Sequence, residues 1–181
     1  MSTRSLWTAL VLAAACLASA PLRADEYEDI EKLYRAGDLQ QALRRADEVI
    51  AAQPRAAQLR FLKGVMLTDM KRNAQAIEVF TALTQDFPEL PDPYNNLAVL
   101  HAADGQLQSA LVALQTALRN DPTHRAAREN LGDVHLALAM QAWTAAQAGA
   151  KGDDAGLRRK LQLAREIQLV PPPPPTPRPA G

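Results

Sequence analysis

One pattern is written twice in consecutive stretches of equal length: 57–90 reads AQLRFLKGVMLTDMKRNAQAIEVFTALTQDFPEL and 91–124 reads PDPYNNLAVLHAADGQLQSALVALQTALRNDPTH. The same spacing extends back to Gly37 and Pro54 and forward to Gly132. A fixed period of about 34 residues indicates a repeat architecture, in which each repeat buries its apolar face against the next. The matched pairs are Gly64 and Ala98, Leu67 and His101, Ala76 and Ala110, Phe80 and Leu114, Leu83 and Ala117, and Pro88 and Pro122.

Apolar residues within each stretch recur at helical spacing, as Leu59, Leu62 and Val65 do. Glycine or proline then closes each helical segment, with Gly105 and Pro122 as examples. Aromatic residues make up only 4% of the chain, which suits close helix packing better than a pleated sheet. The sequence therefore predicts an all-α fold, an α-solenoid of stacked antiparallel helix pairs with about three to four repeats and a C-terminal capping helix.

The repeated positions have separate packing roles in this prediction. Small residues at Gly64, Ala98 and Gly132 allow the two helices of a pair to approach closely. Larger residues at Phe80 and Leu114 fill the space between one pair and the next. A single pair leaves an apolar face open, so consecutive pairs are expected to stack.

The repeated residues resemble the tetratricopeptide repeat family, whose members are built from pairs of helices. This resemblance implies three repeats and a degenerate fourth that keeps Leu131 and Gly132. The family often has an aromatic residue where this chain has Arg60 and Arg128, and only Tyr94 keeps one there. The expected segments are a signal peptide at 1–24, repeats at 25–56, 57–90, 91–124 and 125–148, a capping helix at 155–169 and a Pro-rich disordered tail at 170–181.

The segment 1–24 has the pattern of a secretory signal peptide. Arg4 precedes an apolar run that is too short to span a membrane comfortably, and small residues lead to a cleavage site expected after Ala24. We therefore expect a periplasmic or secreted protein with a slight excess of acidic side chains. Cys16 follows the apolar run and offers an alternative, an envelope lipoprotein anchored through that residue.

The sequence contains no motif of a known catalytic or cofactor site. It has no Gly-rich phosphate loop, HExxH, GxSxG or cysteine pair, so neither an enzyme nor a cofactor is expected. His101 and His135 occupy the same place in adjacent repeats, without a converging third ligand, and no metal is expected. The formal net charge of zero provides no basic stripe for nucleic acid.

The resemblance implies a concave lining made by the first helix of each repeat, and this lining is partly apolar and clearly acidic. Asn96 and Asn130, one full period apart, occupy a place where family members use amides to hold extended peptides. The alternative is a solvated polar face that happens to repeat. The candidate partner-binding residues are Phe61, Leu62, Val65, Asn95, Asn96, Val99, Glu129, Asn130 and Asp133.

These observations predict a non-enzymatic scaffold of the cell envelope that binds a protein or extended peptide on its concave surface. The acidic lining favours basic or apolar partners over acidic ones. A lipid-anchored assembly factor that clusters other proteins is the alternative, and contact with a membrane is expected only in that case. The tail has three interpretations: a frayed end, a spacer, or a ligand for an aromatic-lined groove.

Overall fold

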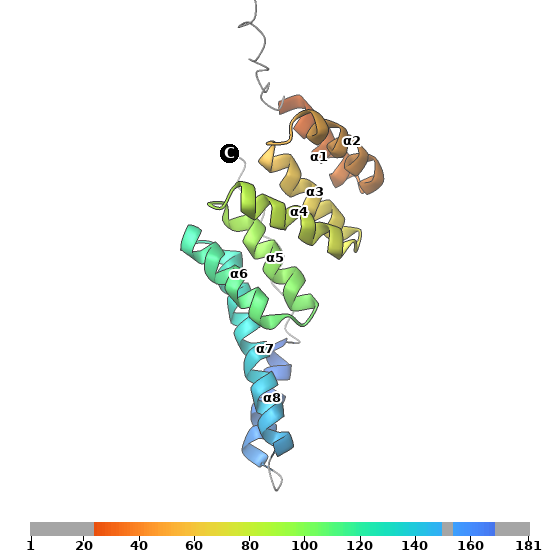
Figure 1. Ribbon diagram of the computed structural model, residues 1–181. Coiled ribbons are helices and arrows are strands. Elements are labelled where there is room, and N and C mark those ends of the chain that lie inside the picture. Colours follow the sequence, from red (N-terminus) through yellow and green to blue (C-terminus); the bar gives the residue numbers. More distant parts are fainter. Residues whose placement is uncertain (1–23, 150–153, 169–181) are drawn as a thin grey trace, which may run out of the picture. The chain divides into compact units, whose positions relative to one another are not determined.

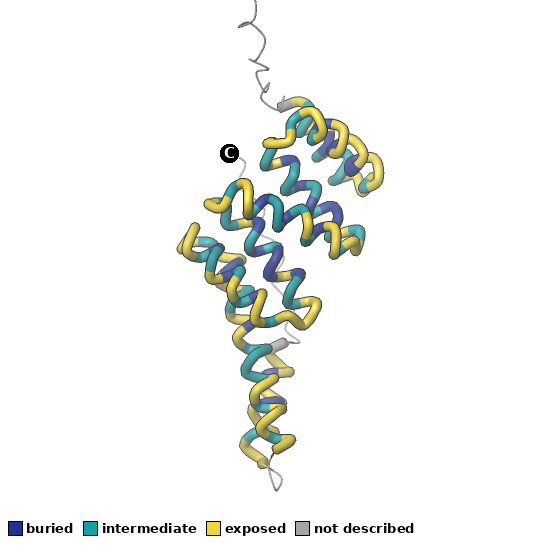
Figure 2. Tube along the Cα trace, viewed as in Figure 1, coloured by how far each residue is buried: buried dark blue, intermediate teal, exposed yellow. Residues whose placement is uncertain are grey.

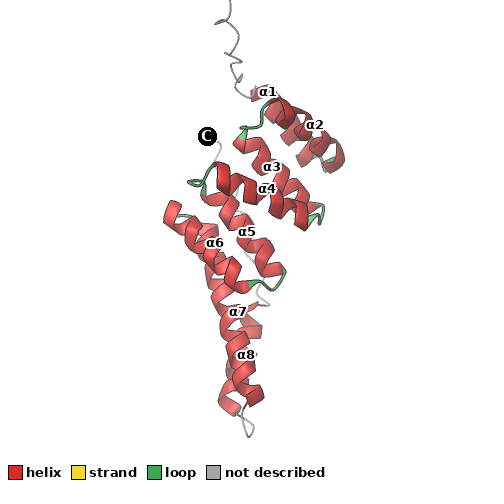
Figure 3. Cartoon of the chain, viewed as in Figure 1, coloured by secondary structure: helices red, strands yellow, loops and turns green. Residues whose placement is uncertain are grey.

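The computed structural model describes residues 24–149 and 154–168, and every regular element among them is a helix (Figure 3). This confirms the predicted all-α fold. The expected signal peptide, the possible lipidation at Cys16 and the Pro-rich tail lie outside the described residues. The helices are α1 (Ala24–Arg35), α2 (Leu39–Ala52), α3 (Ala57–Asp69), α4 (Asn73–Asp86), α5 (Pro91–Ala103), α6 (Leu107–Asn120), α7 (Arg125–Gly149) and α8 (Ala155–Gln168) (Figure 1).

The chain divides into two compact units after Ala76, within the first turn of α4. In the first unit α1 packs against α2, and α2 packs against α3. Lys63 Nζ lies 2.6 Å from Asp47 Oδ1 and joins α3 to α2. Figure 2 shows buried segments, in dark blue, along the helices of this unit. Its buried side chains include Ile30, Ala42, Leu43, Ala46, Val49, Leu59, Leu62, Met66, Leu67 and Ala76.

In the second unit, α6 packs against both α5 and α7, and α5 also contacts α7. One apolar cluster joins these three helices, because small residues let them approach while Leu114 fills the centre. Partly buried Tyr94, Leu131 and Leu138 pack around that cluster. Its buried members are Ala98, Ala110, Leu114, Ala117, Ala127 and Val134.

The turns inside the first three helix pairs repeat with the period of the sequence. Gly37, Lys71 and Gly105 occupy equivalent places and have φ values of 81°, 59° and 73°. At each turn the following N–H donates to a carbonyl five residues earlier, as from Gln106 to His101 over 2.8 Å. The left-handed residue thus closes each first helix and starts the reversal of direction. Lysine does so at the middle turn without the conformational freedom of glycine.

The prolines start or follow helices without interrupting them. Pro91 occupies the first turn of α5, where its missing N–H would have no helical partner, and Pro93 is buried in the same turn. The apolar pattern starts at Tyr94 and indicates a helix from there. Helix α5 begins three residues earlier, at Pro91. The guanidinium groups of Arg60 and Arg128 donate to the carbonyls of Pro54 and Pro122, respectively. Arginine thus ties the helix to the preceding turn at the two places where the family often has an aromatic residue.

The fourth pair differs, because α7 continues through the place where a turn would fall. Ala139 stands one period after Gly105 and remains helical, and α7 runs on to Gly149. Alanine has the highest helix propensity and nothing nearby interrupts the backbone hydrogen bonds. The range 125–148 is consequently one helix, and α8 packs against it through buried Leu161 and Ala164.

Gly132 does not have the packing role that its position in the repeat indicates. It is exposed on α7, and a Cβ atom added there would meet no heavy atom within 4 Å. The prediction that its small size permits a close helix approach is therefore wrong. The reason is that this side of α7 faces solvent.

Candidate interaction surface

Helices α5 and α7 form the part of the predicted lining that the second unit contains. Asn130 Nδ2 on α7 donates to Asn95 Oδ1 on α5 over 2.8 Å, a tie between the two helices. Asn95 is only 9% exposed, so its side chain mainly holds the helices together. We call this surface the α5–α7 face and define it by Asp92, Asn95, Asn96, Val99, Glu129, Asn130 and Asp133.

The two asparagines singled out by the repeat do not have equivalent partners. Asn96 Nδ2 donates to the carbonyl of Asp92 in its own helix over 2.9 Å, whereas Asn130 donates to Asn95. A primary amide carries two N–H groups, so each asparagine uses one donor in these bonds and keeps a second. Both side chains are partly exposed, and each can offer that donor to a ligand carbonyl.

An apolar contact lies among the acidic side chains of this face. Val99 is 45% exposed on α5, which is unusual for a large aliphatic residue in the middle of a packed helix. Glu129 and Asp133 are exposed on α7. The face thus combines amide donors, an aliphatic side chain and carboxylates, and it has the chemistry to hold an extended chain that carries a positive charge.

His124 fixes the end of this face at the start of α7. Its Nδ1 accepts the backbone N–H of Ala127 over 3.1 Å, so the side chain caps the helix. Its Nε2 lies 3.1 Å from Asp92 Oδ1 on α5. Because Nδ1 accepts, Nε2 carries the proton and donates to the carboxylate. The sequence pattern gave no indication of this role, since it marked only the other two histidines.

The remaining predicted lining lies on α3 in the first unit. Phe61 and Val65 are partly buried, and Leu62 is 7% exposed, so Leu62 chiefly stabilises the helix packing. On the same unit Tyr34 Oη donates to Asp69 Oδ2 over 2.7 Å and joins α1 to α3. Burial and this hydrogen bond to a carboxylate raise the pKa of Tyr34 from 10.0 to about 12.

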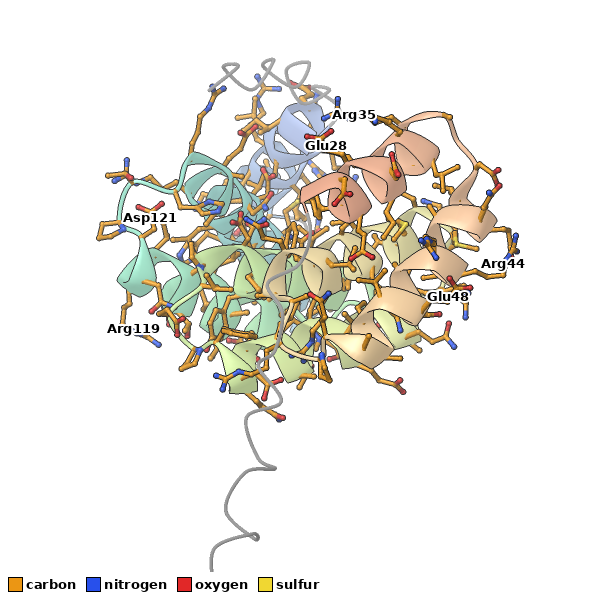
Figure 4. The ribbon with its side chains drawn as sticks, turned by 90° about the horizontal axis from the view of Figure 1, so that it is seen from above. Glu28, Arg35, Arg44, Glu48, Arg119 and Asp121 are labelled. Carbon is orange, nitrogen blue, oxygen red and sulfur yellow. The ribbon has the colours of Figure 1, made fainter. Side chains whose placement is uncertain are left out.

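Three ion pairs lie within α1 or α2, between Lys32 and Asp29, Arg35 and Glu31, and Arg45 and Glu48. Arg35 donates to Glu31 over 2.8 Å, and Figure 4 shows Arg35 on the same helix as Glu28. In the turn after α6, Asp121 accepts from the hydroxyl and the backbone N–H of Thr123, which lowers the pKa of that carboxyl. These contacts stabilise helix ends and turns, and the repeat pattern did not single them out.

The histidines that share a place in the repeat do not form a metal site. Over residues 24–149 and 154–168, no group of three or more His, Cys, Asp or Glu side chains could hold an ion. His101 Nδ1 lies 3.0 Å from Gln106 Oε1, which places it at the turn after α5, and His135 is exposed on α7. Among the same residues, no helix combines the length and the hydropathy that a bilayer span requires.

Comparison with solved structures shows the fold. The first tetratricopeptide domain of Spaghetti (RPAP3), bound to the HSP90 peptide SRMEEVD, has a TM-score of 0.60 and 18% identity, and the match covers 64% of this chain and 91% of that one. The second such domain of human RPAP3, in complex with the HSP70 peptide SGPTIEEVD, has a TM-score of 0.57 and 16% identity, covering 61% and 92%. MamA from Desulfovibrio magneticus RS-1 has a TM-score of 0.57 and 22% identity, covering 79% and 73%.

Family models match the sequence directly, whereas no curated protein matched it. Two models, each described as a tetratricopeptide repeat, match residues 31–91 and 67–128. Their ranges overlap and contain α2 to α6 with parts of α1 and α7. The helix pairs and the sequence therefore agree, and this chain is a tetratricopeptide-repeat protein across residues 31–128.

Proposed function

We propose that the chain is a non-enzymatic interaction scaffold and that the α5–α7 face binds an extended segment of a protein partner. The observation that carries this proposal is the pair of partly exposed amides, Asn96 and Asn130, each with one N–H group unused by its structural bond. An extended chain presents backbone carbonyls that such donors can bind. The RPAP3 domains of the same fold are described with bound peptides, which supports this mode of binding.

The charge of the face supports a basic or apolar partner. Glu129 and Asp133 are exposed on α7, and Asp92 is exposed at the start of α5. These carboxylates repel an acidic segment and attract Lys or Arg side chains. Val99 offers aliphatic contact between them. The peptides bound by the RPAP3 domains contain consecutive Glu residues, so the partner proposed for this chain has the opposite charge.

Peptide titration tests the charge preference. We expect an extended peptide containing Lys and Leu to bind more tightly than one in which Glu replaces Lys, with the difference reduced at high salt. The combined Glu129→Lys and Asp133→Lys variant should reverse this order. Equal affinity for both peptides in the unaltered chain would contradict the proposed charge preference.

Substitution of the amide tests the site itself. We expect Asn96→Ala to weaken binding of the partner or peptide about tenfold, since the variant loses one hydrogen bond to the ligand. Gln115→Ala is the matched control, because Gln115 is an exposed amide on α6, away from the face. The proposal fails if the two variants bind equally. Circular dichroism of both variants verifies that the helices remain formed.

The proposed location of this scaffold is the cell envelope, which the protein reaches by export followed by cleavage of the signal peptide after Ala24. The apolar run and small residues at 1–24 support export. Mass spectrometry of the N-terminus of the protein isolated from cells tests this: a chain beginning at Asp25 supports the proposal. A lipid-modified Cys16 supports the alternative of an anchored assembly factor, and an intact Met1 contradicts both.

A further inference from the structure

The α7 helix carries one continuous stripe of residues spaced alternately four and three apart, which places them on one side of the helix. Its first two members are acidic and exposed, and its last four are partly buried. The stripe therefore changes along the helix, from charged and exposed to mainly apolar and partly buried. Its members are Glu129, Asp133, Leu136, Met140, Trp143 and Gln147.

Helix α8 covers the apolar part of this stripe. Lys160 Nζ lies 5.7 Å from the centre of the Trp143 ring, and Gln147 lines one depression together with Leu161 and Ala155. Neighbouring residues on the other sides of α7, such as Ala145, are exposed. Helix α8 runs beside the later part of α7 (Figure 1). The residue spacing places Glu129 and Asp133 on the same side of α7, closer to its N-terminus.

The direction of α8 leads the chain towards those acidic residues. Only five residues separate α7 from α8, so the two helices run antiparallel. From Lys160 to the end of α8 at Gln168 the helix rises ~12 Å, and the same rise along α7 leads from Trp143 to about His135. The next member of the stripe is Asp133. The last described residue, Gln168, therefore ends α8 near the level of Asp133 on the α5–α7 face.

The sequence after α8 is complementary to that face. Residues 169–181 contain seven prolines and one cation, Arg178, and no acidic residue. Proline has a carbonyl acceptor and no N–H donor. The second amide N–H groups of Asn96 and Asn130 supply donors, and Glu129 and Asp133 supply negative charge. Acceptors and a cation on the segment thus match donors and carboxylates on the face.

We propose that residues 169–181 bind the α5–α7 face of their own chain and compete there with an external partner. The inference rests on the proposed function, because both occupants use the same face. Arg178 pairs with the carboxylates of Glu129 and Asp133, and proline carbonyls accept from Asn96 and Asn130. Prolines limit the conformations of the free segment, so little entropy is lost when it binds.

A spin label on the segment tests this binding without any external partner. The full chain with Cys16→Ser and Ala180→Cys is labelled at position 180, and relaxation enhancement is measured at backbone amides. We expect strong broadening at Val99 and Asp133 and much weaker broadening at Gln115, which is exposed on α6 in the same unit. Uniform weak broadening at all three amides would overturn the proposal. Broadening that falls when the labelled chain is diluted with unlabelled chain would assign the segment to a second copy and also overturn it.

Charge exchange tests the pairing of Arg178. Arg178→Glu should reduce the broadening at Val99 several-fold, and combining it with Glu129→Arg and Asp133→Arg should restore it. Failure of the combined variant to restore broadening would contradict the pairing. In a chain that binds an external basic peptide, Arg178→Glu should also raise the affinity for that peptide. If the peptide binds through Asn96 but the segment shows no broadening, the proposed function stands and this inference fails.

Discussion

The hydroxyl of Tyr34 on α1 donates to the carboxylate of Asp69 on α3 over 2.7 Å, and the two residues are 35 positions apart. Asn95 and Asn130 are separated by the same number of residues and join α5 to α7. In both cases a side chain on the first helix of one pair contacts the first helix of the next. Side-chain hydrogen bonds of this kind reinforce the apolar packing within each unit.

The tie between Tyr34 and Asp69 makes stability depend on pH in the alkaline range. Because folding raises the pKa of Tyr34 from 10.0 to about 12, the neutral phenol stabilises the folded state fully below pH 10. This stabilisation is lost as pH rises from 10 towards 12. We expect Tyr34→Phe to lower the free energy of unfolding by about 1 kcal/mol at neutral pH. Urea denaturation at neutral pH and near pH 12 measures the difference in free energy of unfolding between Tyr34→Phe and the unaltered chain.

Tyr94→Phe is the control for that experiment, since its hydroxyl makes only a 3.4 Å contact with the carbonyl of Thr84. We expect it to change stability less than Tyr34→Phe does at neutral pH. A difference between Tyr34→Phe and the unaltered chain that stays constant from pH 9 to 12 would contradict the assigned pKa shift.

The turn at Lys71 offers a stabilising substitution. A left-handed φ of 59° is unfavourable for a residue with a Cβ atom, so Lys71→Gly should raise the free energy of unfolding by about 0.5–1 kcal/mol. Gly105→Ala, at the equivalent turn, should lower it by about 1 kcal/mol. Denaturant midpoints of the two variants measure the opposite effects. If both substitutions lower the free energy of unfolding, the side chain of Lys71 stabilises the fold by more than its left-handed backbone conformation destabilises it.

Gly132, the exposed glycine inside α7, offers a second stabilising substitution. A Cβ atom at Gly132 meets open space, so Gly132→Ala should stabilise the chain by up to about 1 kcal/mol through helix propensity alone. Thermal unfolding followed by circular dichroism detects the change as a raised midpoint. Ala142→Gly, at an exposed place on the same helix, should produce the reverse shift. A lowered midpoint for Gly132→Ala would mean that this side of α7 is packed against something.

His124 is expected to be the histidine that matters for stability. His124→Ala removes the cap on the Ala127 N–H and the contact with Asp92, and should cost about 1–2 kcal/mol. His135→Ala is the control, because His135 is exposed and should change stability by less than about 0.5 kcal/mol. Chemical denaturation of the two variants compares them directly. Similar losses at the two positions would contradict the capping role of His124.

The repeat period predicted the helices well because burial repeats with it. Ala76 and Ala110 are both fully buried, as are Phe80 and Leu114. The period could not predict side-chain hydrogen bonds, since Asn130 pairs with Asn95, which lies one residue before its counterpart in the repeat. Such a bond depends on how two neighbouring helices are rotated, and a repeated residue type carries no information on that rotation.

The repeat pattern also gave a wrong prediction where the outcome depends on solvent exposure. Gly132 occupies a place in the repeat that is buried at Gly64 and Ala98, yet it is exposed, because the fourth pair lacks the regular second helix. His124 was missed for another reason. A capping histidine has no fixed partner residue, so its function is visible only from the distance to the Ala127 N–H.

Helix α7 continues without a break through Ala139. The angle around the helix axis between acidic Asp133 and apolar Trp143 is therefore fixed. Inserting one residue into a helix rotates everything beyond it by about 100°. One alanine added after Ala139 would therefore turn Trp143 away from the side that carries Asp133, and α8 would follow Trp143. Adding two full turns of helix, about seven residues, would restore the alignment but lengthen the helix by ~10 Å. Both the angle and the length of this helix thus set where the chain after α8 starts.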